Sequence, residues 1–157
     1  WEDFVKIIPE NERGDVIAAF YRRLTCDDAE LRLAAAKAWS VWEGGTVSLF
    51  PSEERIASFA GDAFALAFAR IECHYFVNGG FFEREGQLIA DIDRIRHIPA
   101  AIVQGRYDVV TPLKTAFELH KAWPEAALVI VQDAGHAASE PGIIDGLVRA
   151  TNKFAAL

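Results

Sequence analysis

The sequence predicts an α/β protein with two dissimilar halves, and three features carry this prediction. Residues 1–90 show helical periodicity and no convincing alternating strand pattern. Two short apolar runs, residues 100–103 and 127–131, are each followed by a glycine and then by a helical pattern. The resulting order of strand, helix, strand and helix is typical of parallel strands covered by helices. We therefore expect a helical domain over residues 1–90 and an α/β segment over residues 91–157.

Two helices are expected in the first part of the chain. Residues 15–24 place apolar side chains at helical spacing. Residues 25–43 begin with Thr25, a candidate N-cap, and have acidic residues in the first turn, where they complement the helix dipole.

A third helical segment covers residues 50–76, in which Ser52 precedes two glutamates as a second candidate N-cap. A break is expected near Gly61. The apolar residues are so dense that we expect most faces of this segment to be covered by other elements, as in the central helix of a bundle.

The second half contains two strand and helix pairs. Residues 100–105 form the first expected strand, after which Thr111 is expected to cap a helix that starts at Pro112. The second strand lies within residues 126–135. The last helix, residues 139–155, carries an apolar face formed by Ile143, Ile144, Leu147, Val148 and Phe154.

Two strands do not form a stable parallel sheet alone. We therefore expect the second half to be one edge of a larger sheet whose other strands are not in this sequence. The sequence begins at Trp1 and contains no methionine, which fits a piece of a longer chain.

Composition excludes several classes of protein. The chain has 157 residues and is 52% hydrophobic, which is ample for a packed core. The formal charge is −7 and the basic residues are scattered, so nucleic acid is not an expected partner. Cys26 and Cys73 lack the CxxC spacing of a zinc or redox site, which favours a reducing compartment. With no signal peptide and no bilayer-spanning run, we expect a cytoplasmic protein that does not contact membranes.

Asp108 and His136 follow the two expected strands in similar settings, "GRYDVVTP" and "DAGHAASEP". Because parallel strands end at the same edge of a sheet, these side chains should emerge next to each other. Such a carboxylate can accept the Nδ1 proton of the histidine and stabilise the imidazolium that forms when Nε2 takes a proton. Taken alone, Asp108 could equally form an Asx turn or cap a helix, and His136 could be an ordinary turn residue.

These motifs resemble the acid and base loops of the α/β-hydrolase superfamily, in which the acid and then the base follow the nucleophile in the chain. Residues 1–90 then resemble the helical cap of that fold. Within them, "WSVWEG" and "RIECHYFVNGGFF" resemble the cap of the prolyl aminopeptidases, also called proline iminopeptidases. Enzymes of that family remove an N-terminal proline from peptides. The resemblance implies an α/β-hydrolase fold, here a helical cap followed by the last β-α-β-α part of the sheet.

The resemblance also implies roles for individual residues. Asp108 is implied as the triad acid, and His136 as the general base and acid. Glu72 and Glu43 are implied as ligands of the free amine of the N-terminal proline, because a carboxylate in a partly dry pocket makes a charge-assisted hydrogen bond to an ammonium.

Phe76 and Tyr75 are implied as apolar walls against the pyrrolidine ring of the substrate. Neither a metal nor another cofactor is needed for this chemistry. The simpler structural interpretations remain open: Glu72 could be a helix-end carboxylate paired with Arg70, and the aromatic residues, including Trp39, could be core.

The sequence departs from the family pattern at the nucleophile. None of the five serines has the flanking glycines of a GxSxG elbow. We expect the nucleophile and the oxyanion hole in a missing N-terminal part of the same enzyme, which leaves the present chain inactive alone. Two alternatives remain: another capped α/β-hydrolase, such as an esterase or an epoxide hydrolase, and a non-catalytic interaction fragment.

Overall fold

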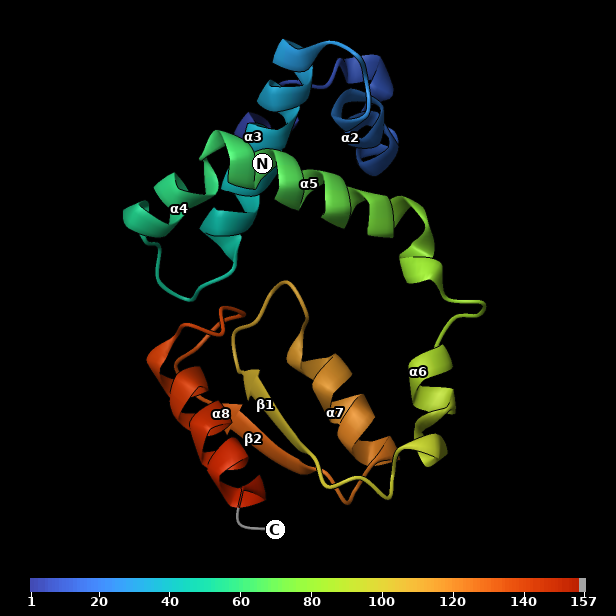
Figure 1. Ribbon diagram of the computed structural model, residues 1–157, viewed down its shortest axis with the longest axis vertical. Coiled ribbons are helices and arrows are strands. Elements are labelled where there is room, and N and C mark those ends of the chain that lie inside the picture. The colour runs from blue at the N-terminus through green and yellow to red at the C-terminus, as the bar shows by residue number, and fades with distance from the viewer. Residues whose placement is uncertain (156–157) are drawn as a thin grey trace. The chain divides into compact units, whose positions relative to one another are not determined.

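The computed structural model describes residues 1–155 and consists of two compact units (Figure 1). The first unit contains residues 1–45 and 52–82, and the second contains residues 46–51 together with the chain from residue 83 onward. The first unit is helical, and the second holds the sheet. Among residues 1–155, no helix has both the length and the apolar composition needed to cross a bilayer.

The first unit is built around α2, α3 and α5. Its elements are α1 (Glu2–Val5), η1 (Glu10–Glu12), α2 (Val16–Leu24), α3 (Ala29–Thr46), α4 (Glu53–Phe59), α5 (Asp62–Val77) and η2 (Gly79–Phe81). Aromatic rings form the centre of its core. The ring centroid of Phe20 lies 4.7 Å from that of Phe4 and 5.2 Å from that of Trp39. These buried rings join the N-terminal segment to α2 and α3.

The helix starts agree with the sequence pattern at one position and differ at another. Ser52 caps α4 as predicted, since its hydroxyl accepts a hydrogen bond from the backbone N–H of Arg55, and the break near Gly61 separates α4 from α5. The prediction for Thr25 was wrong. Its hydroxyl donates to the carbonyl of Tyr21 at the end of α2, while the Asp28 carboxylate accepts the first free N–H groups of α3. An aspartate directly before the helix is a strong N-cap, and Asp28 stands nearer to the first residue of α3 than Thr25 does.

The expectation that most faces of α5 are covered was also wrong. The residues of α5 that are fully buried are small, namely Ala65, Ala69 and Cys73, and they lie at four-residue spacing on one face. Small side chains let α2 approach this face closely. Leu66 and Phe68 are partly buried against the core, but other large residues of the helix are at the surface; Ile71, for example, is 62% exposed.

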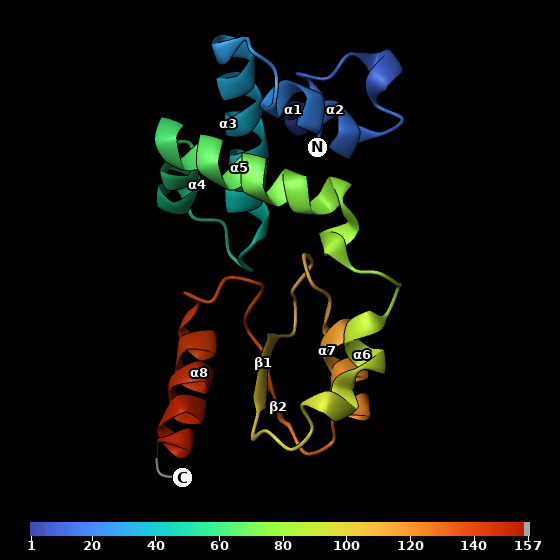
Figure 2. The same ribbon diagram turned by 45° about the vertical axis from the view of Figure 1, so that its right-hand side comes forward.

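The second unit contains a parallel two-stranded sheet between helices (Figure 2). Its elements are α6 (Gln87–Ala90), η3 (Ile92–Arg94), β1 (Ala101–Gly105), α7 (Leu113–Ala122), β2 (Ala127–Val131) and α8 (Pro141–Phe154). The strands are in register from Ala101 opposite Ala127 to Gly105 opposite Val131, so they end level with each other. This is the predicted order of strand, helix, strand and helix.

The alternation of side chains along β1 assigns its two faces. Ile102 packs with Trp123 on the side of α7, and Val103 packs with Val131 and Ile143 on the side of α8. Figure 2 shows α7 and α8 on opposite sides of the strands. Of the predicted apolar face of α8, Ile143 is buried, whereas Ile144 and Val148 are 47% and 50% exposed.

Candidate active site

Asp108 and His136 lie together beyond the carboxyl ends of the two strands. Asp108 follows the end of β1, and His136 follows the end of β2. The distance between His136 Nδ1 and Asp108 Oδ2 is 3.0 Å. The parallel register makes this contact possible, because it brings the two turns to the same edge of the sheet.

Backbone contacts hold the two turns against each other. The N–H of Arg106 donates to the carbonyl of Val131 at 2.8 Å, and the N–H of Tyr107 donates to the carbonyl of Ala134 at 3.0 Å. At Gly105, a Cβ atom would lie only 1.9 Å from the carbonyl oxygen of Gly135. Glycine is therefore required at position 105, and the separation of the Asp108 and His136 turns is set by the main chain.

The carboxylate of Asp108 is buried, and both of its oxygens accept hydrogen bonds. Oδ1 accepts the backbone N–H groups of Val110 and Thr111 at 2.9 and 2.8 Å. Oδ2 accepts the Thr111 hydroxyl at 2.8 Å and the Gln104 side-chain amide at 2.9 Å, in addition to facing His136. One oxygen thus forms the turn, and the other faces the histidine.

Hydrogen bonding keeps Asp108 ionised. Burial by itself would raise the pKa of this carboxyl group, but hydrogen bonds from the Thr111 backbone, from His136 and from the Thr111 hydroxyl outweigh burial, and the pKa is lowered. Because an ionised carboxylate can only accept hydrogen bonds, the proton of the neutral imidazole belongs on Nδ1. Nε2 then has a free lone pair and can take a proton from a nucleophile.

Sequence reasoning missed the roles of Gln104 and Thr111 around this pair. Thr111 was expected to cap the following helix, but α7 begins at Leu113 after Pro112 with no side-chain cap. Its hydroxyl instead donates to Asp108 and lies 3.1 Å from His136 Nδ1. The signal for this role was the position of Thr111 three residues after Asp108, where an aspartate turn brings both side chains together.

In the first unit, Glu72 lies on α5 and accepts a hydrogen bond from Trp39. The distance from Trp39 Nε1 to Glu72 Oε2 is 2.6 Å, and Trp39 is buried. Burial raises the pKa of the neighbouring Cys73 thiol to about 11, and the negative charge of Glu72 adds to this effect. Trp39 is therefore a core residue, which agrees with the structural interpretation given above. Its indole N–H also fixes the orientation of Glu72.

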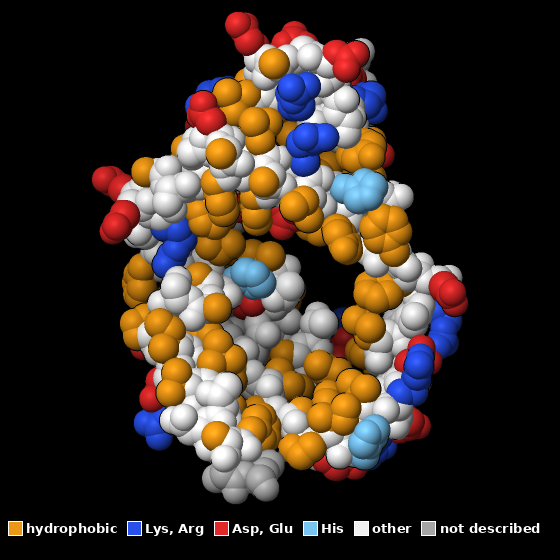
Figure 3. Space-filling model, viewed as in Figure 1, with side chains coloured by type: hydrophobic (Ala, Val, Ile, Leu, Met, Phe, Trp, Pro, Cys, Tyr) orange, Lys and Arg blue, Asp and Glu red, His pale blue; other side chains and the backbone are white. Residues whose placement is uncertain are grey.

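The other candidate substrate residues surround the same region of the first unit. Phe76 and Tyr75 are each 53% exposed, and the Phe76 ring centroid lies 5.9 Å from that of Trp39. Glu43 is half-buried on α3, four residues after Trp39 and therefore on the same side of that helix. Figure 3 shows hydrophobic side chains along the visible face of α5. This part of the cap thus presents carboxylates next to aromatic surface.

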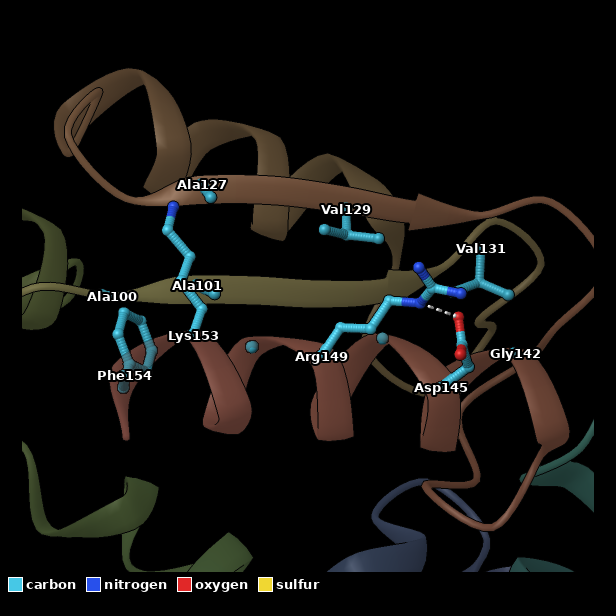
Figure 4. A pocket seen from close by; sticks show the side chains of 12 residues that line it. Ala100, Ala101, Ala127, Val129, Val131, Gly142, Asp145, Arg149, Lys153 and Phe154 are labelled. Atoms are coloured by element: carbon cyan, nitrogen blue, oxygen red, sulfur yellow. Dashed lines mark hydrogen bonds and ion pairs between the residues drawn. The ribbon is translucent and has the colours of Figure 1, made fainter. Parts of the chain in front are cut away.

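A separate pocket of about 450 Å³ lies between α8 and the sheet (Figure 4). Small and apolar residues line it, among them Ala101, Ala127 and Val129, with Arg149 at its rim bound to Asp145 at 2.7 Å. Neither Asp108 nor His136 lines this pocket. The candidate chemistry therefore lies elsewhere.

Comparison with known proteins gives consistent similarities. The family profile Abhydrolase_4, described as TAP-like protein, matches residues 59–149. The proline iminopeptidase of Xylella fastidiosa strain Temecula1 is 59% identical over 154 residues, which cover 98% of this chain and 49% of that protein. A probable proline iminopeptidase of Leptolyngbya boryana is 57% identical over 156 residues, covering 99% of this chain and 49% of that protein.

A plant relative has a similar degree of identity. The proline iminopeptidase of Arabidopsis thaliana is 54% identical over 158 residues, covering 100% of this chain and 42% of that protein. The chain spans about half the length of the curated relatives that it matches.

Proposed function

Because the chain belongs to the TAP-like protein family of α/β-hydrolases, we propose that it supplies the acid, the base and the substrate-binding cap of a serine-type aminopeptidase. The proposed reaction releases N-terminal proline from peptides, as the names of the similar proteins suggest. The observation that carries the proposal is the 3.0 Å contact between His136 Nδ1 and Asp108 Oδ2 at the carboxyl ends of parallel strands. This is the geometry that a serine triad requires of its acid and base.

The proposed chemistry proceeds by acyl transfer. A serine from an upstream segment attacks the carbonyl carbon of the N-terminal proline, and His136 Nε2 takes the serine proton. Asp108 stabilises the imidazolium through Nδ1. His136 then gives the proton to the departing amine, which leaves an acyl-enzyme. Water hydrolyses the acyl-enzyme with His136 as the base, and free proline is released.

Substrate recognition is assigned to the cap. Glu72, and with it Glu43, binds the ammonium group of the N-terminal proline through charge-assisted hydrogen bonds. The hydrogen bond from Trp39 supports this role, since it keeps one Glu72 oxygen oriented. Phe76 and Tyr75 contribute the apolar wall for the pyrrolidine ring, and their half-exposed rings support this assignment. The proposed enzyme uses no metal and acts in the cytoplasm.

The test compares two samples, the 157-residue chain and the same chain with its upstream sequence, in hydrolysis of a proline arylamide. We expect release of the arylamine by the longer protein alone. Release should be abolished by Asp108→Ala and His136→Ala, and weakened by Glu72→Ala. Asp145→Ala is the matched control, since Asp145 is a carboxylate of the same unit that pairs with Arg149 and lines the separate pocket.

An N-acetylated proline arylamide and a simple aryl ester separate this proposal from its alternatives. The proposed aminopeptidase requires the free amine and rejects the acetylated substrate. Equal turnover of both arylamides, or turnover of the ester alone, would identify a different capped hydrolase. If folded samples of both lengths fail on every substrate, the chain is a binding or interaction protein.

A further inference from the structure

Residues 46–51, here called the strap, connect α3 to α4 but pack within the second unit. The carbonyl oxygen of Val47 accepts two backbone hydrogen bonds, from His136 N at 2.8 Å and from Ala137 N at 2.7 Å. The strap therefore holds the backbone of the histidine itself. Its two ends continue directly into cap helices.

The side chain of Glu140 also links the strap to the histidine turn. Oε1 of its side chain accepts the backbone N–H of Leu49 in the strap at 2.7 Å. Oε2 accepts the backbone N–H of Gly135, the residue before His136. One carboxylate thus binds both the strap and the histidine turn. Although Glu140 occupies the N-cap position of α8, its side chain does not cap that helix.

Burial makes this bridge costly to break. Glu140 is only 9% exposed, and a buried carboxylate is tolerated when hydrogen bonds replace its lost hydration. The strap and the turn also touch closely, because a Cβ atom on Gly135 would lie 2.8 Å from the backbone nitrogen of Leu49. The histidine turn therefore has little freedom while Glu140 is in place.

We propose that Glu140 is a positioning residue for His136, acting through Gly135 and the strap. Three backbone N–H groups of the turn are bound: Gly135 by Glu140, and His136 and Ala137 by the carbonyl of Val47. Glu140 also binds the N–H of Leu49 in the strap. Loss of the Glu140 bridge frees Gly135 and Leu49 together, and His136 Nδ1 loses its alignment with Asp108 Oδ2. The consequence for catalysis rests on the proposed hydrolase function, whereas the alignment itself can be measured without activity.

The experiment uses the full-length protein with Glu140→Gln, Glu140→Asp and the control Asp145→Asn. The two N–H groups bind different oxygens of Glu140, and in Glu140→Gln one of these oxygens becomes an NH2 group, so one N–H loses its acceptor. In Glu140→Asp the charge remains, but the shorter side chain cannot span both groups. Three quantities are measured: kcat and KM for a proline arylamide, the NMR resonance of the His136 Nδ1 proton, and hydrogen exchange of residues 46–51 and 133–137.

In both Glu140 variants we expect kcat to fall by between about tenfold and a hundredfold with little change in KM, as for a displaced catalytic group. The Nδ1 proton resonance should broaden or disappear, and exchange should accelerate in both segments. Glu140→Asp serves as the test if Glu140→Gln fails to fold. Asp145→Asn should leave all three quantities unchanged.

Faster exchange with an unchanged Nδ1 resonance and unchanged kcat would overturn the proposal, because Glu140 would then stabilise the loop without aligning the histidine. If the wild-type protein lacks peptidase activity, the function proposed above fails, and the resonance alone decides the positioning role. Its loss in the variants supports the role, and its persistence refutes it.

Discussion

The indole N–H of Trp39 donates a hydrogen bond to Glu72 Oε2 across 2.6 Å, which links the aromatic core of the cap to its candidate substrate carboxylate. Trp39 is held between Phe20 and Phe76, with ring centroids 5.2 and 5.9 Å away. A carboxylate bound to so rigid a donor has the accepting oxygen oriented. Core packing and ligand orientation thus depend on the same side chain.

Trp39→Phe should weaken substrate binding more than turnover in the proposed aminopeptidase. Phenylalanine preserves much of the aromatic packing but removes the donor to Glu72. A hydrogen bond to a charged group contributes roughly 1.5–3 kcal/mol, so we expect KM for a proline arylamide to rise about tenfold or more. Trp42→Phe is the control for loss of a tryptophan from the same helix. Equal KM values for the two variants would contradict the orienting role of Trp39.

Thr111→Val should reduce kcat/KM by about tenfold, because it removes one donor to Asp108 Oδ2 and the hydroxyl next to His136 Nδ1. Thr111→Ser keeps the hydroxyl and should restore most of the activity. Steady-state kinetics of both variants in the full-length protein provide the measurement. If Thr111→Ser loses as much activity as Thr111→Val, the hydroxyl alone does not account for the role of Thr111.

Gly105→Ala should destabilise the second unit, since the added Cβ would lie 1.9 Å from the carbonyl oxygen of Gly135. The backbone must move to relieve this contact, and we expect a loss of about 1–3 kcal/mol or more in the free energy of unfolding. Gly14→Ala is the matched control, because nothing lies within 4 Å of a Cβ there. Comparable melting temperatures for the two variants would show that the two turns do not need this close approach.

Asp108 should make stability depend on pH in the acid range. Its pKa is lowered in the folded protein, so its ionised form contributes stability above the unfolded-state pKa of about 3.9. That contribution is lost as the pH falls through the lower folded-state value. The difference in unfolding free energy between wild type and Asp108→Asn should therefore be larger at about pH 5 than at about pH 3.

Chemical denaturation at several pH values measures this difference, with Asp145→Asn as the control for an exposed carboxylate. Asp145 has 60% of its side chain exposed and pairs with Arg149. A difference for Asp108→Asn that stays constant down to about pH 3 would contradict a lowered pKa.

Much of the fold follows from local pattern. The β-branched runs at 100–103 and 127–131 became strands, and the order of strand, helix, strand and helix required their carboxyl ends to coincide. That order is enough to bring Asp108 and His136 together. Near the starts of α3 and α7, where several polar residues stand close together, the local sequence did not identify the role of each one. Thr25 was predicted to cap α3, but Asp28 does so, and Thr111 was predicted to cap the next helix, but its hydroxyl donates to Asp108.

The sequence by itself determined the helical and α/β halves, the placement of Asp108 and His136 after the two strands, and the resemblance to hydrolases with a helical cap. Only the tertiary structure decided which groups support those residues: Gln104 and Thr111 for Asp108, Trp39 for Glu72, and Glu140 with the strap for the turn of His136. The physical reason is the range of the interactions. Periodicity and turn chemistry act between neighbours in the chain, whereas Glu140 and Leu49 are 91 positions apart and meet only after the chain has folded.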